Sequence, residues 1–205
     1  MIDDALGNFL MLFVTIDPIG TLSLFVPLTS GLDARQRARV ALRAVVCAGV
    51  VLMGFLVAGQ LVLSGMGVQL VSFQLAGGVV LFLFGLQMIF GTGVADPRAS
   101  VDADHDVAVF PLAVPSIASP GSIMAVVLLT DNHAHSIPEQ TMTAGVLVLV
   151  LLITFVALRL AGPIHRVLGS TGASVMIRVM GLLLAALAAE QVVEGVVEVT
   201  QAVRG

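Results

Sequence analysis

The sequence predicts an all-α, polytopic membrane protein, with six transmembrane helices in two inverted three-helix repeats and with helices 1 and 4 broken at mid-membrane. Three observations support this prediction. The 205 residues are 58% hydrophobic and 11% charged, with a mean hydropathy of +1.09, which is typical of chains embedded in lipid. Long apolar runs recur along the chain, and a proline-centred motif interrupts two of them near the middle.

Six apolar runs are long enough to cross a bilayer, because about 20 residues at about 1.5 Å each cover a hydrocarbon core of about 30 Å. The expected spans are Asn8–Leu28, Ala44–Leu63, Leu70–Phe90, Ala108–Leu129, Thr141–Leu160 and Val175–Val197. Glycine lets membrane helices approach closely. The expected spans carry it at Gly77, Gly78, Gly85, Gly145 and Gly181.

The basic residues are all arginine, and their distribution predicts the orientation. In a six-span arrangement eight arginines fall on one side, between spans one and two, three and four, and five and six, and only Arg204 falls on the other. The positive-inside rule makes the eight-arginine side cytoplasmic, so both termini are expected outside. The net charge of −4 gives no reason to expect a nucleic-acid partner, and the single Cys47 excludes a disulfide framework.

An internal repeat relates the two halves of the chain. Phe73–Gly77 matches Ile177–Gly181, and at the same offset Gln87–Gly91 matches Gln191–Gly195. We expect a first repeat over residues 1–95, a cytoplasmic acidic linker over 96–106 and a second repeat over 107–205. Because each half has three spans, the second half enters from the opposite side, which predicts an inverted-topology repeat.

The two interrupted helices mark the expected binding site. Proline lacks an N–H, and glycine permits close approach by a ligand, so Asp17–Thr21 and Ser119–Ile123 should each break a helix and leave polar backbone groups in lipid. Paired breaks of this kind point to the binding site of a secondary transporter. The candidate substrate-binding residues are Asp17, Pro18, Gly20, Thr21, Ser119, Pro120, Gly121 and Ser122.

Asp17 lies roughly 14 Å into the first span, where an ionised carboxylate facing lipid costs at least about 2.5–3.5 kcal/mol. It could bind a substrate ammonium, pick up and release a proton, or cap the half-helix that starts at Pro18. These roles are compatible. The half-helix N-termini are expected to meet a substrate carboxylate through their partial positive charge.

For other polar residues on the expected spans, a structural role is an alternative to a functional one. Gln74, Gln87, Arg178 and Gln191 are supporting polar residues. Of these, Gln87 and Gln191 are repeat mates expected to bridge helices, and Arg178 is either an anchor, a partner for carbonyl groups or a substrate clamp. Glu190 is a second candidate for proton coupling, or a side chain that reaches the outer interface.

No cofactor, metal site or enzymatic activity is predicted. Asp102–Asp106 and Asp131–His135 carry possible metal ligands, but Asp102–Asp106 lacks the glycine and distal glutamate of a calcium loop, and both are interpreted as solvated loops. No nucleophile–base pair or phosphate-binding glycine loop is visible. The arginines of Arg35–Arg43 suit a cytoplasmic anchor for anionic lipid.

Several of these stretches resemble the MarC family, which is also described as a family of six-span neutral amino acid transporters. The matching stretches are Asp17–Gly20, Phe73–Leu81, Phe110–Pro115, Ser119–Gly121 and Arg178–Leu182. The resemblance implies a multi-pass protein of the bacterial inner membrane and, for some members, movement of glycine and alanine. The chain departs from the family pattern at Thr21 and Ser23, at Ser119 and at Gln74.

The sequence therefore favours a secondary transporter of small neutral solutes, foremost small neutral amino acids, with alternating access and a proton-coupling candidate in Asp17. Two alternatives stay open: a passive channel or facilitator for a small polar solute, and a membrane interaction protein that transports nothing. The expected partners are a small-molecule substrate, membrane lipids and a second copy of the chain.

Overall fold

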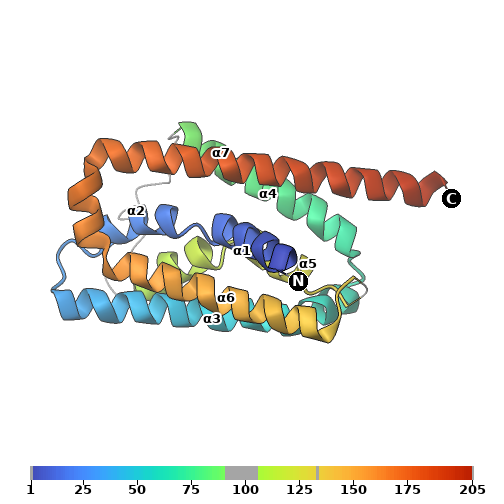
Figure 1. The fold of residues 1–205 in the computed structure, drawn as a ribbon, viewed down its shortest axis with the longest axis horizontal. Coiled ribbons are helices and arrows are strands. Elements are labelled where there is room, and N and C mark those ends of the chain that lie inside the picture. Colours follow the sequence, from blue (N-terminus) through green and yellow to red (C-terminus); the bar gives the residue numbers. More distant parts are fainter. Residues whose placement is uncertain (1, 91–105, 133, 205) are drawn as a thin grey trace.

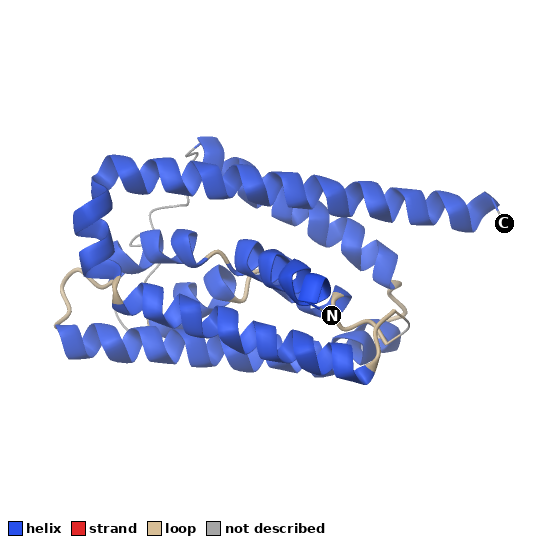
Figure 2. Ribbon diagram, in the orientation of Figure 1, coloured by secondary structure: helices blue, strands red, loops and turns tan. Residues whose placement is uncertain are grey.

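A computed structural model describes residues 2–90, 106–132 and 134–204, and these are helical apart from short connections (Figure 2). The elements are α1 (Ile2–Ile16), α2 (Pro18–Leu28), α3 (Ala34–Gly65), α4 (Leu70–Phe90), η1 (Ala108–Ile117), α5 (Pro120–Leu128), α6 (Ile137–Arg159) and α7 (Ala161–Arg204). Five stretches, counting α1 and α2 together, are long and apolar enough to cross a membrane, or six if the bent pair of η1 and α5 is one span. This confirms the all-α, polytopic prediction.

The helices stack in three layers (Figure 1). α3 and α6 pack together in one outer layer, α4 and α7 in the other, and the broken pairs α1–α2 and η1–α5 lie between them. The central helices contact both outer layers, since α2 touches α6 and α7, and α5 touches α3 and α4. The fold therefore places both interruptions inside the bundle, where Ile16 and Ala118 are buried.

The core is divided unequally between the two interfaces of the central layer. Most buried apolar side chains lie between the central layer and α3–α6, in a cluster that includes Phe25, Leu52 and Leu147. A smaller cluster of Leu81, Met124, Leu184 and Ala188 joins α5 to α4 and α7. The α4–α7 pair is thus bound to the rest of the protein by fewer buried side chains.

Helices approach closely at four of the five predicted glycines, and three of these four lie between α4 and α7. A Cβ at Gly85 or Gly181 would lie 2.8 Å from a backbone oxygen of the other helix, and Gly78 faces Ala188. Gly77 packs against Met124 of α5. The prediction is wrong for Gly145, because a Cβ there would meet nothing within 4 Å.

The two largest differences from the sequence-based spans are at the starts of α3 and α7. α3 begins ten residues before the expected span because Asp33 accepts the N–H groups of Arg35 and Gln36, and Gln36 accepts the N–H of Asp33, which forms a capping box. The predicted loop between spans five and six is wrong, since α7 starts two residues after α6 ends. Pro163 lies in the first turn of α7, where proline is tolerated, and Figure 1 shows α7 turning soon after its start.

Candidate functional site at the two helix breaks

The first break is built around Asp17. The N–H that would continue the helix to the carbonyl of Val14 is missing, because the residue four positions on is Pro18. Asp17 adopts left-handed backbone angles (φ 49°, ψ 72°), and its carboxylate caps α2 by accepting the N–H of Gly20 at 2.9 Å. Gly20 must lack a side chain here, since a Cβ would strike that carboxylate. The capping role proposed for Asp17 is confirmed.

Asp17 is also a buried carboxylate without a counter-ion. Its exposed fraction is 4%, and no basic side chain pairs with it among residues 2–90, 106–132 and 134–204. A buried ion that lacks a partner of opposite charge costs several kcal/mol. The first break therefore offers a place where a cation or a proton would be stabilised.

The second break repeats the capping arrangement with a neutral residue. η1 ends at Ile117, and α5 starts at Pro120 at an angle of 52° to it. Ser119 caps α5 by accepting the N–H of Ser122 at 3.0 Å. The hydroxyl of Ser122 donates to the carbonyl of Ile117 at 2.8 Å, so the freed backbone of η1 is partly satisfied within the break.

The two breaks touch each other. Ser119 donates its hydroxyl to the carbonyl of Thr15 at 3.2 Å, across the end of α1. Thr21 of α2 and Ser116 of η1 share a hydrogen bond at 2.9 Å between their hydroxyl oxygens. Polar residues of both motifs are therefore brought together, and the structure adds Thr15 and Ser116 to them. Pro120, which was also predicted for the site, is exposed.

Sequence reasoning missed Thr15 and Ser116 for an identifiable reason. Both lie two to three residues before a break, inside apolar runs where one hydroxyl residue is usually bonded to its own helix. Thr15 does so, donating to the carbonyl of Met11 at 2.8 Å. The signal that could have found them is their position, because carbonyl groups just before a proline break lose their helical donors.

The N-terminus of α2 does not match the expectation that both half-helices would receive a carboxylate. The Asp17 carboxylate takes the N–H of Gly20, its backbone carbonyl takes that of Thr21, and Pro18 has none. The α2 end is therefore anionic. At α5, Ser119 takes the N–H groups of Ser122 and Ile123, and the N–H of Gly121 has no partner in the described part of the chain.

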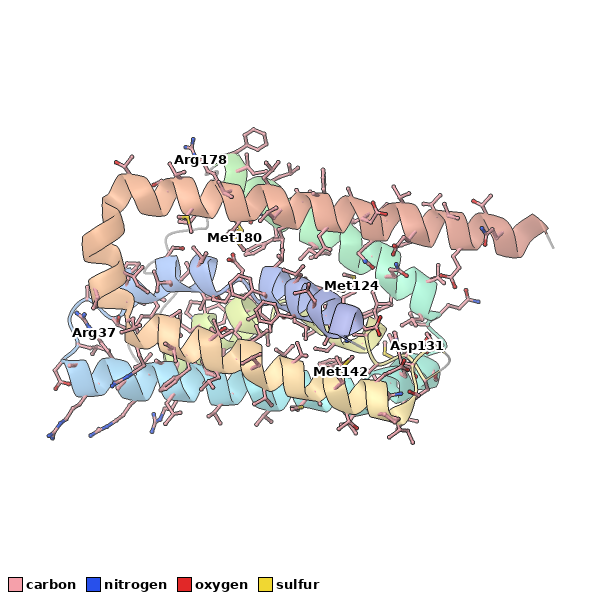
Figure 3. All side chains as sticks on the ribbon, viewed as in Figure 1. Arg37, Met124, Asp131, Met142, Arg178 and Met180 are labelled. Atoms are coloured by element: carbon pink, nitrogen blue, oxygen red, sulfur yellow. The ribbon has the colours of Figure 1, made fainter. Side chains whose placement is uncertain are left out.

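The supporting polar residues lie elsewhere. Gln74 of α4 donates to Gln191 of α7 at 2.9 Å and to Glu194 at 3.4 Å. Gln191 thus bridges helices as expected, but through Gln74, because Gln87, the residue that the sequence match predicted as its mate, is exposed. Glu190 and Arg178 are exposed on α7, and the Arg178 side chain points away from the bundle in Figure 3.

The two acidic loops are placed only in part. Asp106 pairs with Arg43 at 3.3 Å, and Asp131 accepts a hydrogen bond from Gln60. Residues 102–105 and His133 lie outside the described residues, as does the predicted linker 96–106 apart from Asp106. Within the described ranges, no three His, Cys, Asp or Glu side chains gather closely enough to hold a metal ion.

Comparison with known proteins identifies the family. A family model described as MarC family integral membrane protein matches residues 4–200. The chain belongs to the MarC family. MarC relatives include a UPF0056 membrane protein of Archaeoglobus fulgidus, 32% identical over 197 residues (94% of this chain and 92% of the relative). Another is the UPF0056 inner membrane protein YhgN of Escherichia coli K12, 28% identical over 198 residues (95% and 96%). No solved structure matches.

Proposed function

We propose that this MarC protein is a secondary transporter of small neutral solutes, foremost small neutral amino acids, that works by alternating access around the two broken helices. The contact between the breaks carries the proposal. Ser119 reaches the carbonyl of Thr15, and Thr21 meets Ser116, so two interruptions from distant parts of the chain form one polar cluster, which is buried apart from Ser116. Discontinuous helices that meet in this way are the usual construction of a transporter binding site.

The contacts between helices support the inverted repeat that alternating access requires. If a two-fold axis relates the halves, a residue near the axis contacts its equivalent in the other half. The two residues are then separated in the sequence by the length of one repeat. Thr15 and Ser119 are 104 residues apart, and Gly49 and Leu151, which pack across α3 and α6, are 102 apart. In the antiparallel α4–α7 pair, Gly78 faces Ala188 and Gly85 faces Gly181. These pairs are 110 and 96 residues apart, one separation above and one below the 102 to 104 residues found at the other two contacts.

The different caps orient a zwitterionic substrate. The ammonium belongs at the first break, where Asp17 is buried and anionic and the carbonyl of Val14 lacks its helical donor. The carboxylate belongs at the N-terminus of α5, where the Gly121 N–H is free among the described residues and the cap is neutral. This arrangement favours glycine and alanine over amines or simple carboxylic acids.

Proton coupling, where it occurs, is assigned to Asp17 rather than Glu190. Asp17 is buried in the cluster, whereas Glu190 is exposed on α7. The relative YhgN is named an inner membrane protein, and the same location is proposed for this chain. The arginine-rich side then faces the cytoplasm, and both termini lie outside. Because six helices offer little enclosing wall, a second copy of the chain is a reasonable partner.

Purified protein in proteoliposomes tests the proposal. Vesicles loaded with unlabelled glycine should accumulate external labelled glycine by counterflow, and alanine should compete, whereas ethylamine and acetate should not. In detergent, saturating glycine should raise the melting temperature, since a ligand at 100 times its Kd adds about 2.7 kcal/mol. Protein-free vesicles are the control.

The alternatives correspond to distinct results. Flux that follows the concentration gradient, with no counterflow and no response to a proton gradient, would replace the transporter with a passive facilitator. Neither flux nor a thermal shift with any neutral amino acid at millimolar concentration would favour an interaction protein that transports nothing.

A further inference from the structure

One exposed face of α3 changes from apolar to basic within a single turn. Residues spaced three, four or seven apart along a helix lie on one face, and on α3 such a series is exposed to the surroundings of the bundle. Its members are Arg35, Arg39, Leu42, Val46, Val50, Gly54, Val57 and Leu61. We call this series the outer face of α3.

The apolar part of the outer face has the length of a bilayer core. From Leu42 to Leu61 it extends about 29 Å at about 1.5 Å per residue, against a hydrocarbon thickness of about 30 Å. Leu42 is 52% exposed and Leu61 is 77% exposed, so this strip meets lipid along its whole length. Arg39 and Arg35 then lie about 5 and about 10 Å beyond its edge, at the depth of the phosphate groups.

The neighbouring arginines on α3 are already engaged. Arg37 donates to the carbonyl groups of Thr29 at 3.0 Å and Ser30 at 3.2 Å, and so ties α3 to the end of α2. Arg43 pairs with Asp106 at 3.3 Å. Arg35 and Arg39 are exposed, and within the described ranges they pair with no carboxylate. In Figure 3 nitrogen-tipped side chains at the start of α3 point away from the bundle.

We infer that Arg35 and Arg39 bind the phosphate of an anionic phospholipid whose acyl chains lie along Leu42 and Val46. The two guanidinium groups are one helical turn apart and can clamp a single phosphodiester. Asp33, the acidic residue that precedes them in the sequence, is occupied in capping α3. Because Arg37 fastens this turn to the end of α2, the bound lipid steadies the half-helix that follows the first break.

Lipid retention by the full-length protein tests this inference. Delipidated protein in detergent is titrated with phosphatidylglycerol or phosphatidylcholine, and bound lipid is counted by native mass spectrometry. The protein should retain phosphatidylglycerol preferentially, and R35Q/R39Q should bind it roughly thirtyfold more weakly, because each arginine that contacts the bound phosphate contributes a factor of about five. Melting temperatures check that the variant is folded.

A second double variant removes the same charge elsewhere. R159Q/R178Q changes two exposed arginines on α6 and α7, and it should bind phosphatidylglycerol within about twofold of the parent. Equal losses in the two double variants, or equal retention of the two lipids, would overturn the inference. Displacement of the lipid by inorganic phosphate at the same concentration would replace the lipid with a free anion as the occupant.

Discussion

The two helix breaks share a backbone design and differ in charge. Each has proline in the first turn of the half-helix that follows, and each has a cap that accepts the N–H of the residue three positions on. The first cap is the buried carboxylate of Asp17 in a left-handed conformation, and the second is the hydroxyl of Ser119 in an extended one. The interruption thus occurs twice while the charge does not, so the polar cluster has an anionic end and a neutral end.

The largest expected effect comes from removing the charge at the first break alone. Asp17→Asn keeps an amide oxygen that caps as well as a carboxylate, so the melting temperature should fall little or rise. A hydrogen bond to a charged group contributes about 1.5–3 kcal/mol. The apparent affinity for glycine, measured by counterflow, should therefore fall roughly ten- to hundredfold.

Asp17→Ala provides the matched comparison, because it removes the cap as well as the charge. It should lose stability where Asp17→Asn does not, by about 0.5–2 kcal/mol. If Asp17→Asn transports glycine with the parent's affinity, the anionic end of the cluster has no role in binding and the two breaks are functionally alike.

The next largest effect is expected on stability, at the glycines that follow the two prolines. Gly20→Ala places a methyl group on the Asp17 carboxylate, whose position is fixed by its cap bonds, whereas Gly121→Ala places it on the tip of Leu81. Overpacking costs about 1–3 kcal/mol, and we expect Gly20→Ala near the top of that range and Gly121→Ala near the bottom. Thermal unfolding in detergent measures both.

Gly145→Ala is the control for these substitutions. It lies in α6 with nothing within 4 Å of a new Cβ, so alanine should stabilise that helix by about 0.5–1 kcal/mol.

Combining Gly121→Ala with Leu81→Ala removes the clash, and the pair should be less destabilising than the sum of the single changes. Strict additivity would show that Leu81 is not what excludes a side chain at Gly121.

Replacing Ser119 should affect both stability and glycine flux, whereas replacing an ordinary helix cap should affect stability alone. Ser119→Ala removes the cap of α5 and also the bond to Thr15, which together should cost about 1–2 kcal/mol. Asp33→Ala removes a cap at the exposed start of α3 and should leave glycine flux unchanged. Equal effects of the two variants on flux would mean that the contact between the breaks has no part in transport.

Much of the fold follows from local physics and could be predicted. Hydropathy predicted both ends of α4 at the observed residues, and the absence of an N–H on proline predicted the positions of both breaks. Both signals depend only on nearby residues. Hydropathy could not predict the continuous start of α7, since helices continue beyond the hydrocarbon region wherever the backbone permits. It also gave no sign that Phe110 and Val114 of η1 adopt extended backbone angles.

The site was less predictable because its partners are distant in the sequence. The residues within each motif were identified, but the pairing of Thr21 with Ser116 crosses 95 residues. Likewise, repeat matching suggested Gln87 as the counterpart of Gln191, whereas antiparallel packing of α4 and α7 places Gln74 beside it. Matching the two halves in sequence pairs residues by position, whereas contact between them depends on how the helices pack.

The smallest expected effect is at the hydroxyl pair that joins the breaks. Thr21→Val keeps the shape of the side chain but leaves Ser116 without its partner, which should cost about 0.5–1.5 kcal/mol. The combination with Ser116→Ala should recover part of that loss, because no unpaired hydroxyl remains. Thr200→Val, at an exposed site on α7, should change stability by less than about 0.5 kcal/mol. If Thr21→Val costs no more than Thr200→Val, the hydroxyl pair does not help to join the breaks, and Ser119 makes the hydrogen bond that stabilises their contact.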